Sequence, residues 1–294
     1  MAERGNGGLS TEAIRNGLTT RYVGHTVYYW PIIGSTNDEL KRLAQEDGAP
    51  DGTLAVADDQ SAGRGRLDRK WLAPAGSSRL MSLLFRPAFL DPAHAQQLTM
   101  ICSLAAADAV SELTGLQPDL KWPNDLLWQG KKLAGVLTEL GFGEEDTLTP
   151  QEDEASDSPS TDVSPSSRVV LAWVVVGMGL NINLNFTDWP DLVDTATSLS
   201  LALGRPVSRL LLLHRWLVGV EDRYDALRAG QSPHHEWAAR LATVGQSVIV
   251  TAPDGVHRGV AVGVDEAGAL LLRRPDGQVK RILAGDVTLR RGRR

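Results

Sequence analysis

Short runs of apolar residues, many of them β-branched, recur along the chain up to about residue 176, and most are bounded by glycine, proline, asparagine or aspartate. Runs of this length and composition predict strands that are buried in a sheet. We expect six of them, at residues 26–30, 53–57, 80–85, 119–122, 133–140 and 169–176.

Between these runs the apolar positions change to helical spacing. A first helix should begin near Ser35 and end by Gly48, and a second should cover residues 92–114. A third should cover about residues 208–227. Strands and helices that are mixed along the chain in this way predict an α+β domain.

From about residue 243 the pattern changes to short strands separated by Asp-Gly turns, which is typical of a small SH3-like β-barrel. Its strands should cover residues 244–250, 257–264, 269–274, 278–283 and 286–289. We therefore expect two domains, a larger one at residues 1–242 and the barrel at residues 243–294.

The segment 142–167 differs in composition from the rest of the chain. It contains eight acidic residues, no basic residue and many Ser, Thr and Pro, but almost no large apolar side chain. Such a segment cannot bury enough surface to offset the entropy of ordering, so we predict a disordered acidic insertion in a hairpin loop. A tolerated insertion is favoured over a regulatory phosphorylation site. The whole chain has a formal charge of −6, and without these eight groups it is +2, so overall charge indicates no class of partner.

The chain has one cysteine, which excludes an internal disulfide; Cys102 lies in an apolar run and is expected in the core. No apolar run approaches the ~20 residues that cross a membrane. The N-terminus also lacks the charged and apolar regions of a signal peptide. We therefore expect a cytoplasmic protein without a membrane partner.

The strongest chemical signal is the segment 63–71, Gly-Arg-Gly-Arg-Leu-Asp-Arg-Lys-Trp. Its glycines allow backbone N–H groups to turn toward an anion, and Arg64 and Arg66 offer forked donors for a carboxylate or a phosphate. Trp71 could cover a ligand once the loop closes. A solvated basic loop explains the composition equally well. Nucleic-acid binding is disfavoured, because one basic loop on a nearly neutral body is a small electrostatic footprint.

Two further segments carry candidate chemistry. Asn124 and Asp125 follow a predicted strand, where catalytic groups often lie, although an Asx-type turn is the better interpretation of that segment taken alone. Lys132 enters a strand with Gly135 three residues later, which places an ammonium over backbone without a side chain and suits a ligand lying on the sheet. The alternative is an edge lysine that discourages aggregation.

A last segment, residues 177–183, reads Gly-Met-Gly-Leu-Asn-Ile-Asn and follows a buried strand. It is not a dinucleotide fingerprint, because the third glycine and the following helix are missing. Asn181 and Asn183 could bind adenine or ribose, or could cap a turn.

In their order and spacing these segments resemble the motif series of biotin protein ligases, over about residues 26–290. The resemblance implies a central mixed sheet flanked by helices, akin to the cores of class II aminoacyl-tRNA synthetases, followed by the SH3-like barrel. The series consists of Ser35-Thr36-Asn37, Gln60 with Gly63-Arg64-Gly65-Arg66 and Trp71, Lys121-Trp122-Pro123-Asn124-Asp125, Lys132-Leu133-Ala134-Gly135, and Gly177-Met178-Gly179-Leu180-Asn181.

The resemblance also implies roles for individual residues. Lys132 would bridge the biotin carboxylate and the α-phosphate with help from Arg64, and Asp125 would accept a proton from the acceptor lysine; these are the implied catalytic residues. Residues 67–68 are less cationic than in many relatives. The positions implied to bind biotin are Ser35, Thr36, Gln60, Gly63, Arg64, Gly65, Arg66, Lys132 and Gly135. Those implied to bind ATP or the adenylate are Arg66, Trp71, Asn124, Lys132 and Asn181.

The implied activity is ATP-dependent formation of biotinyl-5'-AMP and transfer of biotin to a lysine of a biotin carboxyl carrier domain. No dedicated metal ligands are visible, so Mg²⁺ is expected to be held by the phosphates of ATP. A lipoate ligase and a catalytically silent binding module are the alternatives, and the motifs disfavour both. Bifunctional members carry an N-terminal DNA-binding domain. About 25 residues before the first predicted strand are too few for one, so we expect a monofunctional ligase that binds no nucleic acid.

Overall fold

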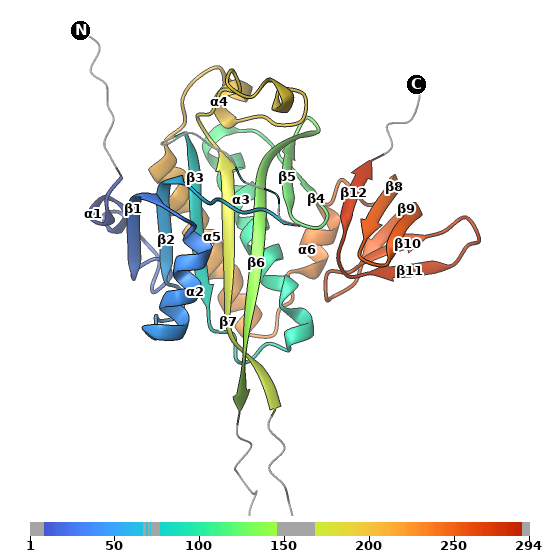
Figure 1. Cartoon of the computed structure of the whole chain (residues 1–294), viewed down its shortest axis with the longest axis horizontal. Coiled ribbons are helices and arrows are strands. Elements are labelled where there is room, and N and C mark those ends of the chain that lie inside the picture. Colours follow the sequence, from blue (N-terminus) through green and yellow to red (C-terminus); the bar gives the residue numbers. More distant parts are fainter. Residues whose placement is uncertain (1–8, 67–68, 70, 72–76, 146–167, 290–294) are drawn as a thin grey trace, which may run out of the picture.

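The computed structural model describes residues 9–66, 69, 71, 77–145 and 168–289. Its larger part is built on a seven-stranded sheet in the order β1-β2-β3-β7-β6-β5-β4, in which β1 and β2 run parallel and the other neighbours antiparallel (Figure 1). The predicted mixed sheet is thus confirmed. The strands are β1 (Val27–Ile33), β2 (Leu54–Gln60), β3 (Ser78–Phe85), β4 (Asp119–Lys121), β5 (Asp125–Trp128), β6 (Lys131–Glu145) and β7 (Arg168–Asn181).

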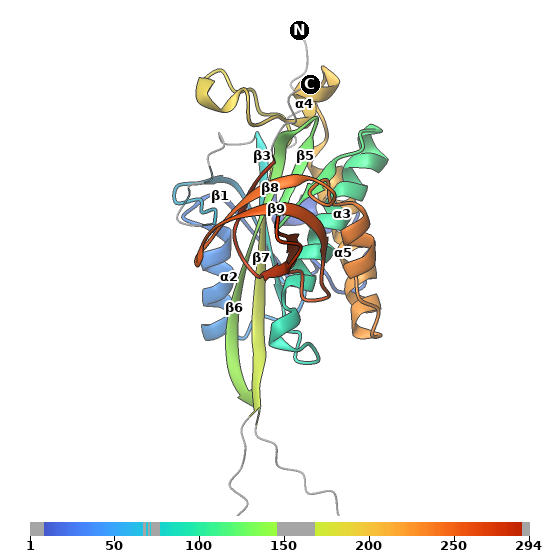
Figure 2. The ribbon, with the colours of Figure 1, turned by 90° about the vertical axis from the view of Figure 1, so that its right-hand side faces the viewer.

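Helices cover both faces of this sheet (Figure 2). The three predicted helices correspond to α2, which lies on one face, and to α3 and α5, which pack together on the other. Three helices of five or six residues were not predicted, because they are too short to show a helical period. None of the described helices is long and apolar enough to cross a membrane. The helices are α1 (Thr11–Arg15), α2 (Thr36–Glu46), α3 (Gln96–Thr114), α4 (Leu199–Leu203), α5 (Arg209–Arg228) and α6 (His234–Ala239), with 3-10 turns at Pro92–His94 and Pro190–Leu192.

Side chains that alternate along the strands divide the core between the two faces. In β3, Leu83 belongs to the large cluster on the α3–α5 side and Leu84 to a smaller cluster under α2. Val174 and Val175 of β7 divide in the same way. Because the strand period is two, each apolar strand supplies both layers. The helix that covers the smaller cluster, α2, begins at Thr36, and the side chain of Ser35 caps it by accepting from the Asp38 N–H.

The C-terminal part is a five-stranded antiparallel sheet in the order β11-β10-β9-β8-β12, as expected for an SH3-like fold. The buried Trp122 connects it to the larger part: its Nε1 donates to the Gly268 carbonyl at 2.8 Å, and its backbone N–H donates to Thr243 Oγ1 at 3.0 Å. The division of the chain at residue 243 stays a prediction. The strands are β8 (Ser247–Ala252), β9 (Gly255–Val264), β10 (Leu270–Arg273), β11 (Val279–Ile282) and β12 (Asp286–Leu289).

Two sequence predictions need correction. The acidic insertion was predicted to begin at residue 142, but β6 continues to Glu145 and pairs with β7 down to Glu145↔Arg168, so backbone pairing outweighs the polar composition there. The rest of the predicted insertion, residues 146–167, lies outside the described residues. The strand β5 was missed because it has four residues and begins at the Asp of an Asn-Asp turn signal.

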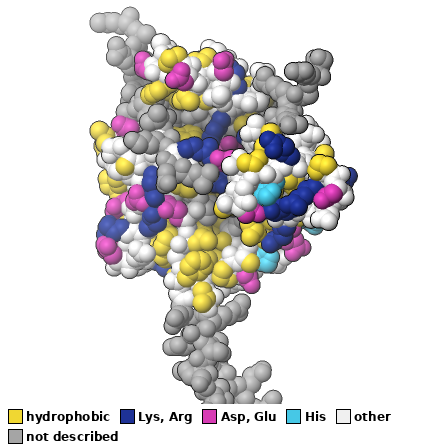
Figure 3. All heavy atoms as spheres, turned by 45° about the vertical axis from the view of Figure 1, so that its right-hand side comes forward, with side chains coloured by type: hydrophobic (Ala, Val, Ile, Leu, Met, Phe, Trp, Pro, Cys, Tyr) yellow, Lys and Arg dark blue, Asp and Glu magenta, His cyan; other side chains and the backbone are white. Residues whose placement is uncertain are grey.

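The ribbon of β6 and β7, which is longer than predicted, extends beyond the other strands of the sheet (Figure 1). Leu140, Phe142 and Val169 are exposed on it. Apolar side chains gather on the surface above its end (Figure 3).

Candidate active site

A cavity of about 560 Å³ lies on the sheet between the N-terminus of α2, the loop that ends at Trp71, the β4–β5 turn and β12. Twelve of the thirteen predicted site residues line it. The exception is Gly63, which closes the base of the loop: the Trp71 N–H donates to the Gly63 carbonyl at 3.0 Å. The twelve are Ser35, Thr36, Gln60, Arg64, Gly65, Arg66, Trp71, Asn124, Asp125, Lys132, Gly135 and Asn181.

Two glycines on neighbouring strands form the floor of the cavity. Gly135 of β6 and Gly179 of β7 are cross-strand partners. A Cβ atom on Gly179 would lie 2.3 Å from Trp71 Cε2, and one on Gly135 would lie 3.1 Å from Trp71 Cζ3. The indole therefore occupies space that any other residue at these positions would fill. Trp71 Nε1 is buried without a hydrogen-bond partner among the described residues, so it is a donor that a ligand can satisfy.

Lys132 stands over this floor because of an irregularity in β6. Residues three apart in a regular strand point to opposite faces. Here the β5–β6 register shifts, so that Leu126 pairs with Ala134 but Leu127 pairs with Lys132. One extra residue in β6 brings the Lys132 ammonium to 3.0 Å from the position of a Cβ on Gly135.

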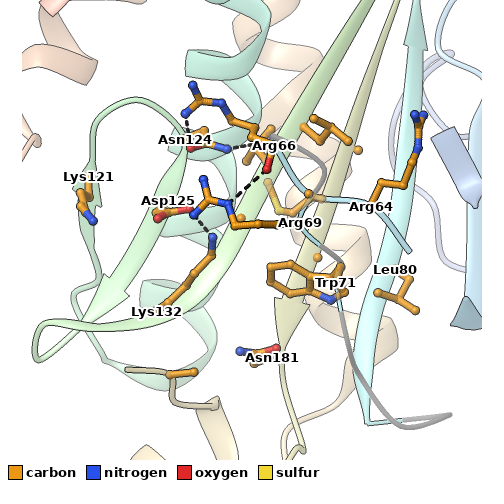
Figure 4. Close-up of a pocket in the computed structure, with 18 of the residues that line it drawn as sticks. Arg64, Arg66, Arg69, Trp71, Leu80, Lys121, Asn124, Asp125, Lys132 and Asn181 are labelled. Atoms are coloured by element: carbon orange, nitrogen blue, oxygen red, sulfur yellow. Dashed lines mark hydrogen bonds and ion pairs between the residues drawn. The ribbon is translucent and has the colours of Figure 1, made fainter. Parts of the chain in front are cut away.

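The Lys132 ammonium has a carboxylate partner. Lys132 Nζ lies 2.6 Å from Asp125 Oδ1 and 5.6 Å from the centroid of the Trp71 ring. Asp125 is positioned by β5, whose first residue it is. The arrangement joins a cation, a carboxylate and an aromatic face at one point of the cavity (Figure 4).

Two loop arginines lie beside this pair and contact the C-terminal part. Arg66 donates to Asn124 Oδ1 at 3.3 Å and to the Gly285 carbonyl at 3.2 Å, and its Nη1 is 3.8 Å from Asp286 Oδ1. Arg69 Nη2 lies 2.5 Å from Asp286 Oδ2. Burial lowers the pKa of Arg66 and outweighs the nearby carboxylates Asp286 and Asp125. A half-buried guanidinium whose nearest carboxylate oxygen is 3.8 Å away can still bind an anion.

Arg64 does not join this group. It points away from Lys132 (Figure 4), and its Nη2 donates to Asp38 Oδ1 at 2.6 Å and to Glu139 Oε1 at 2.8 Å. In this arrangement Arg64 binds protein carboxylates, and contact with a ligand carboxylate requires it to leave them.

The inner end of the cavity is polar and buried. The Thr36 N–H donates to Gln60 Oε1 at 2.7 Å, and the Thr36 hydroxyl oxygen lies 2.9 Å from the same atom. Their neighbours Asn37, Ser82 and Glu139 were not predicted as site residues. Asn37 stood within the Ser-Thr-Asn motif, and Ser82 is a polar residue inside an apolar strand, so both carried a signal.

The two asparagines that are predicted to contact a nucleotide donate hydrogen bonds to backbone carbonyls. Asn181 Nδ2 donates to the Thr197 carbonyl at 3.1 Å, and Asn124 Nδ2 donates to the Val136 carbonyl. Both line the cavity. Among the described residues, no group of three His, Cys, Asp or Glu side chains could hold a metal ion.

The fold and the cavity define a ligase of the biotin and lipoate class. Residues 29–147 match the model of the Biotin/lipoate A/B protein ligase family, and residues 243–290 match that of the Biotin protein ligase C terminal domain.

Curated relatives narrow this class. The chain is 35% identical to the bifunctional ligase/repressor BirA of Bacillus subtilis, over 96% of this chain and 80% of that protein. It is 33% identical to the biotin–[acetyl-CoA-carboxylase] ligase of Mycobacterium tuberculosis, over 86% of this chain and 85% of that protein. The chain belongs to the biotin protein ligase family.

Solved structures of biotin protein ligases have the same fold as this chain. The biotin protein ligase of Aquifex aeolicus in complex with biotin and ATP superposes with a TM-score of 0.70 at 27% identity, over 91% of this chain and 99% of that one. The Leishmania major enzyme in complex with biotinyl-5-AMP has a TM-score of 0.52 at 19% identity, over 88% of this chain and 99% of that one, which shows the fold.

Proposed function

We propose that this chain is a biotin protein ligase that forms biotinyl-5'-AMP from biotin and ATP and transfers biotin to a lysine of a biotin carboxyl carrier domain. One observation carries the proposal: a single cavity of about 560 Å³ joins Lys132 and Arg66 to the polar end formed by Ser35, Thr36 and Gln60. A volume of this order suits a small molecule with one neutral and one anionic end.

We assign the two ends to the two substrates. Biotin would be held by Ser35, Thr36, Gln60, Gly65 and Gly135, with Gly63 shaping the loop. The nucleotide would contact Arg66, Trp71, Asn124 and Asn181, and Lys132 would lie at the junction. Arg64 would assist after releasing Asp38 and Glu139, which bind it here.

In the first step a biotin carboxylate oxygen attacks the α-phosphorus of ATP, and the bond to the β-phosphate oxygen breaks to release pyrophosphate. Two anions must approach, so the protein contributes mainly by position and by positive charge. Lys132 lies between the two ends and Arg66 beside it, which supports these roles.

In the second step the acceptor amine attacks the biotinyl carbonyl carbon, and the bond to the phosphate oxygen breaks to release AMP. The amine must lose a proton, and a free lysine has a pKa of about 10.4. Asp125 is the carboxylate proposed to accept that proton. Its 2.6 Å contact with Lys132 Nζ supports this role, because Lys132 is the residue that we assign to the junction of the two substrates.

Mg²⁺, when bound, would offset charge on the phosphates. The described residues offer no cluster of acidic ligands for it, which supports phosphates and water as its main ligands. The absence of an operator-binding role stays a prediction, and binding of operator DNA by the purified protein at physiological salt would contradict it.

The test is incubation with labelled biotin, MgATP and a biotin carboxyl carrier domain, with lipoate in place of biotin as the comparison. We expect covalent label on the carrier with biotin and none with lipoate. A carrier variant whose acceptor lysine is replaced by arginine is the control. Labelling with lipoate alone would move the chain to the related ligase class.

A further inference from the structure

Glu139 of β6 is a half-buried carboxylate with three different donors. Asn37 Nδ2 donates to its Oε2 at 2.8 Å, and Lys41 Nζ and Arg64 Nη2 reach its Oε1 at 2.7 and 2.8 Å. Burial alone would raise the pKa of Glu139, but the hydrogen bonds from Lys41 and Asn37 outweigh it and hold the pKa below its usual range. The carboxylate is therefore ionised at neutral pH and accepts on both oxygens.

The ionised carboxylate fixes the orientation of the Asn37 amide. Asn37 is 4% exposed, and its Nδ2 also donates to the Leu137 carbonyl at 3.2 Å. With both Nδ2 hydrogens used in this way, Oδ1 must point to the opposite side, where Ser82 Oγ lies at 2.6 Å. A Cβ on Gly177 would lie 2.0 Å from this Oδ1, so glycine at that position makes the orientation possible.

The same network continues to the residues at the inner end of the cavity. The fully buried Ser82 hydroxyl is 2.7 Å from Thr36 Oγ1. The Thr36 N–H in turn donates to Gln60 Oε1 at 2.7 Å. The amide oxygen of Gln60 is thereby committed to the protein, and its Nε2 is the end that can donate to a ligand.

The placement of this network points to a role in the site. Thr36, Asn37, Gln60 and Gly177 all line the cavity. Apolar side chains could attach α2 to the sheet without the cost of burying polar groups. A chain of buried hydrogen bonds that begins at an ionised group and ends at a ligand-facing amide instead fixes which atoms donate and which accept.

We propose that Glu139 is a positioning residue that acts through Asn37, Ser82 and Thr36 to fix the hydrogen bond that Gln60 donates to the urea carbonyl of the biotin ring. This inference rests on the proposed function. A ligand with an acceptor at that position would be bound, and one without it would leave a buried donor unpaired.

The E139Q variant tests the proposal. A carboxamide has one acceptor oxygen, so it must turn its NH₂ either toward Asn37 Nδ2 or toward Lys41 and Arg64. We expect the KM for biotin to rise about tenfold, while kcat and the KM for ATP stay within about twofold, because a hydrogen bond to a charged group is lost at one end only.

Asp38 provides a matched control. Its Oδ1 binds the same two cations, Lys41 Nζ at 2.8 Å and Arg64 Nη2 at 2.6 Å, but Asn37 donates to Glu139 instead. D38N should leave the KM for biotin within about twofold. A rise as large as in E139Q would assign the effect to the cations and overturn the proposal.

A second variant, S82A, interrupts the network without touching Glu139, Lys41 or Arg64. It should raise the KM for biotin selectively, as we expect for E139Q. If E139Q has a lowered melting temperature, S82A provides the test of the proposal. An unchanged KM for biotin in folded S82A would overturn the proposal. Failure of the wild-type protein to use biotin at all would instead overturn the proposed function.

Discussion

The two ends of the cavity are built on different principles. At the inner end Ser35, Thr36, Asn37 and Ser82 are at most 5% exposed, and neutral groups bond to one another. At the outer end the contacts are ion pairs between partly exposed side chains; Lys132 is 36% exposed. Asn37 connects the inner end to a charged group, because its Nδ2 donates to the Glu139 carboxylate.

We expect this difference to separate ligand recognition from catalysis. Buried, fully bonded polar groups discriminate strongly, because a wrong ligand leaves one of them unpaired. Ion pairs such as Lys132–Asp125 and Arg69–Asp286 can instead be exchanged, since an arriving phosphate or carboxylate replaces one anion by another. The inner end should therefore control the KM for biotin, and the outer end should control adenylate formation.

Removal of the central cation is the strongest way to break the outer end alone. K132A should lower the rate of biotin-dependent pyrophosphate exchange about a thousandfold, because two anions lose the charge between them. Equilibrium binding of biotin should weaken far less. Lys131 is the matched control, since its exposed ammonium bonds to the Val193 carbonyl at 2.7 Å. Near-normal exchange in K132A, or an equal loss in K131A, would contradict this assignment.

A methyl group on the floor tests whether Trp71 belongs to the outer end. G179A places a Cβ 2.3 Å from Trp71 Cε2, so the indole must move. We expect kcat/KM for ATP to fall about ten- to a hundredfold, with a smaller change in the KM for biotin. G263A in the C-terminal sheet, where a Cβ meets nothing within 4 Å, should leave both unchanged. A selective loss of biotin binding would instead assign Trp71 to the inner end and contradict the prediction.

The pH dependence should differ between the two ends. The pKa of Glu139 is held below its usual 4.5, so the contribution of this carboxylate is complete above that value and is lost as the pH falls through the lowered pKa. Between pH 8 and 5.5 the KM for biotin should therefore change less than about twofold. The transfer rate should rise with pH, because more of the acceptor amine is neutral. A KM for biotin that rises near pH 6.5 would show that another group governs the inner end.

What the sequence could predict is the part of the site that is local in the chain. Gly-Arg-Gly-Arg with Trp71 lies within nine residues, and Lys132 is three residues from Gly135, so composition and spacing reveal them. Even here the geometry depended on the extra residue in β6, which no periodicity indicated. The larger elements were predicted for the same reason, since their apolar period is repeated several times.

Contacts between distant segments could not be predicted. Asn37 and Glu139 are 102 residues apart, and Arg69 and Asp286 are 217 apart. Such pairs are decided by the order of strands in the sheet and by where the C-terminal part docks, which local patterns do not encode. The orientation of Arg64 is of the same kind, because Asp38 and Glu139 become its neighbours only once α2 lies on β6 and β7.

The smallest expected effect concerns the acidic segment, which begins at residue 146 and not at residue 142, because β6 continues to Glu145. Because Glu145 and Arg168 are paired neighbours, residues 146–167 can be replaced by an Asn-Gly turn that closes the ribbon as a two-residue hairpin. We expect the KM values for biotin and ATP to stay within about twofold and the melting temperature to stay within about 2 °C, since loop length alone changes stability slowly. A deletion that also removes residues 142–145 and 168–171 takes away paired strand and should lower the melting temperature more. A change in the KM for biotin on removal of 146–167 alone would show that this segment reaches the inner end.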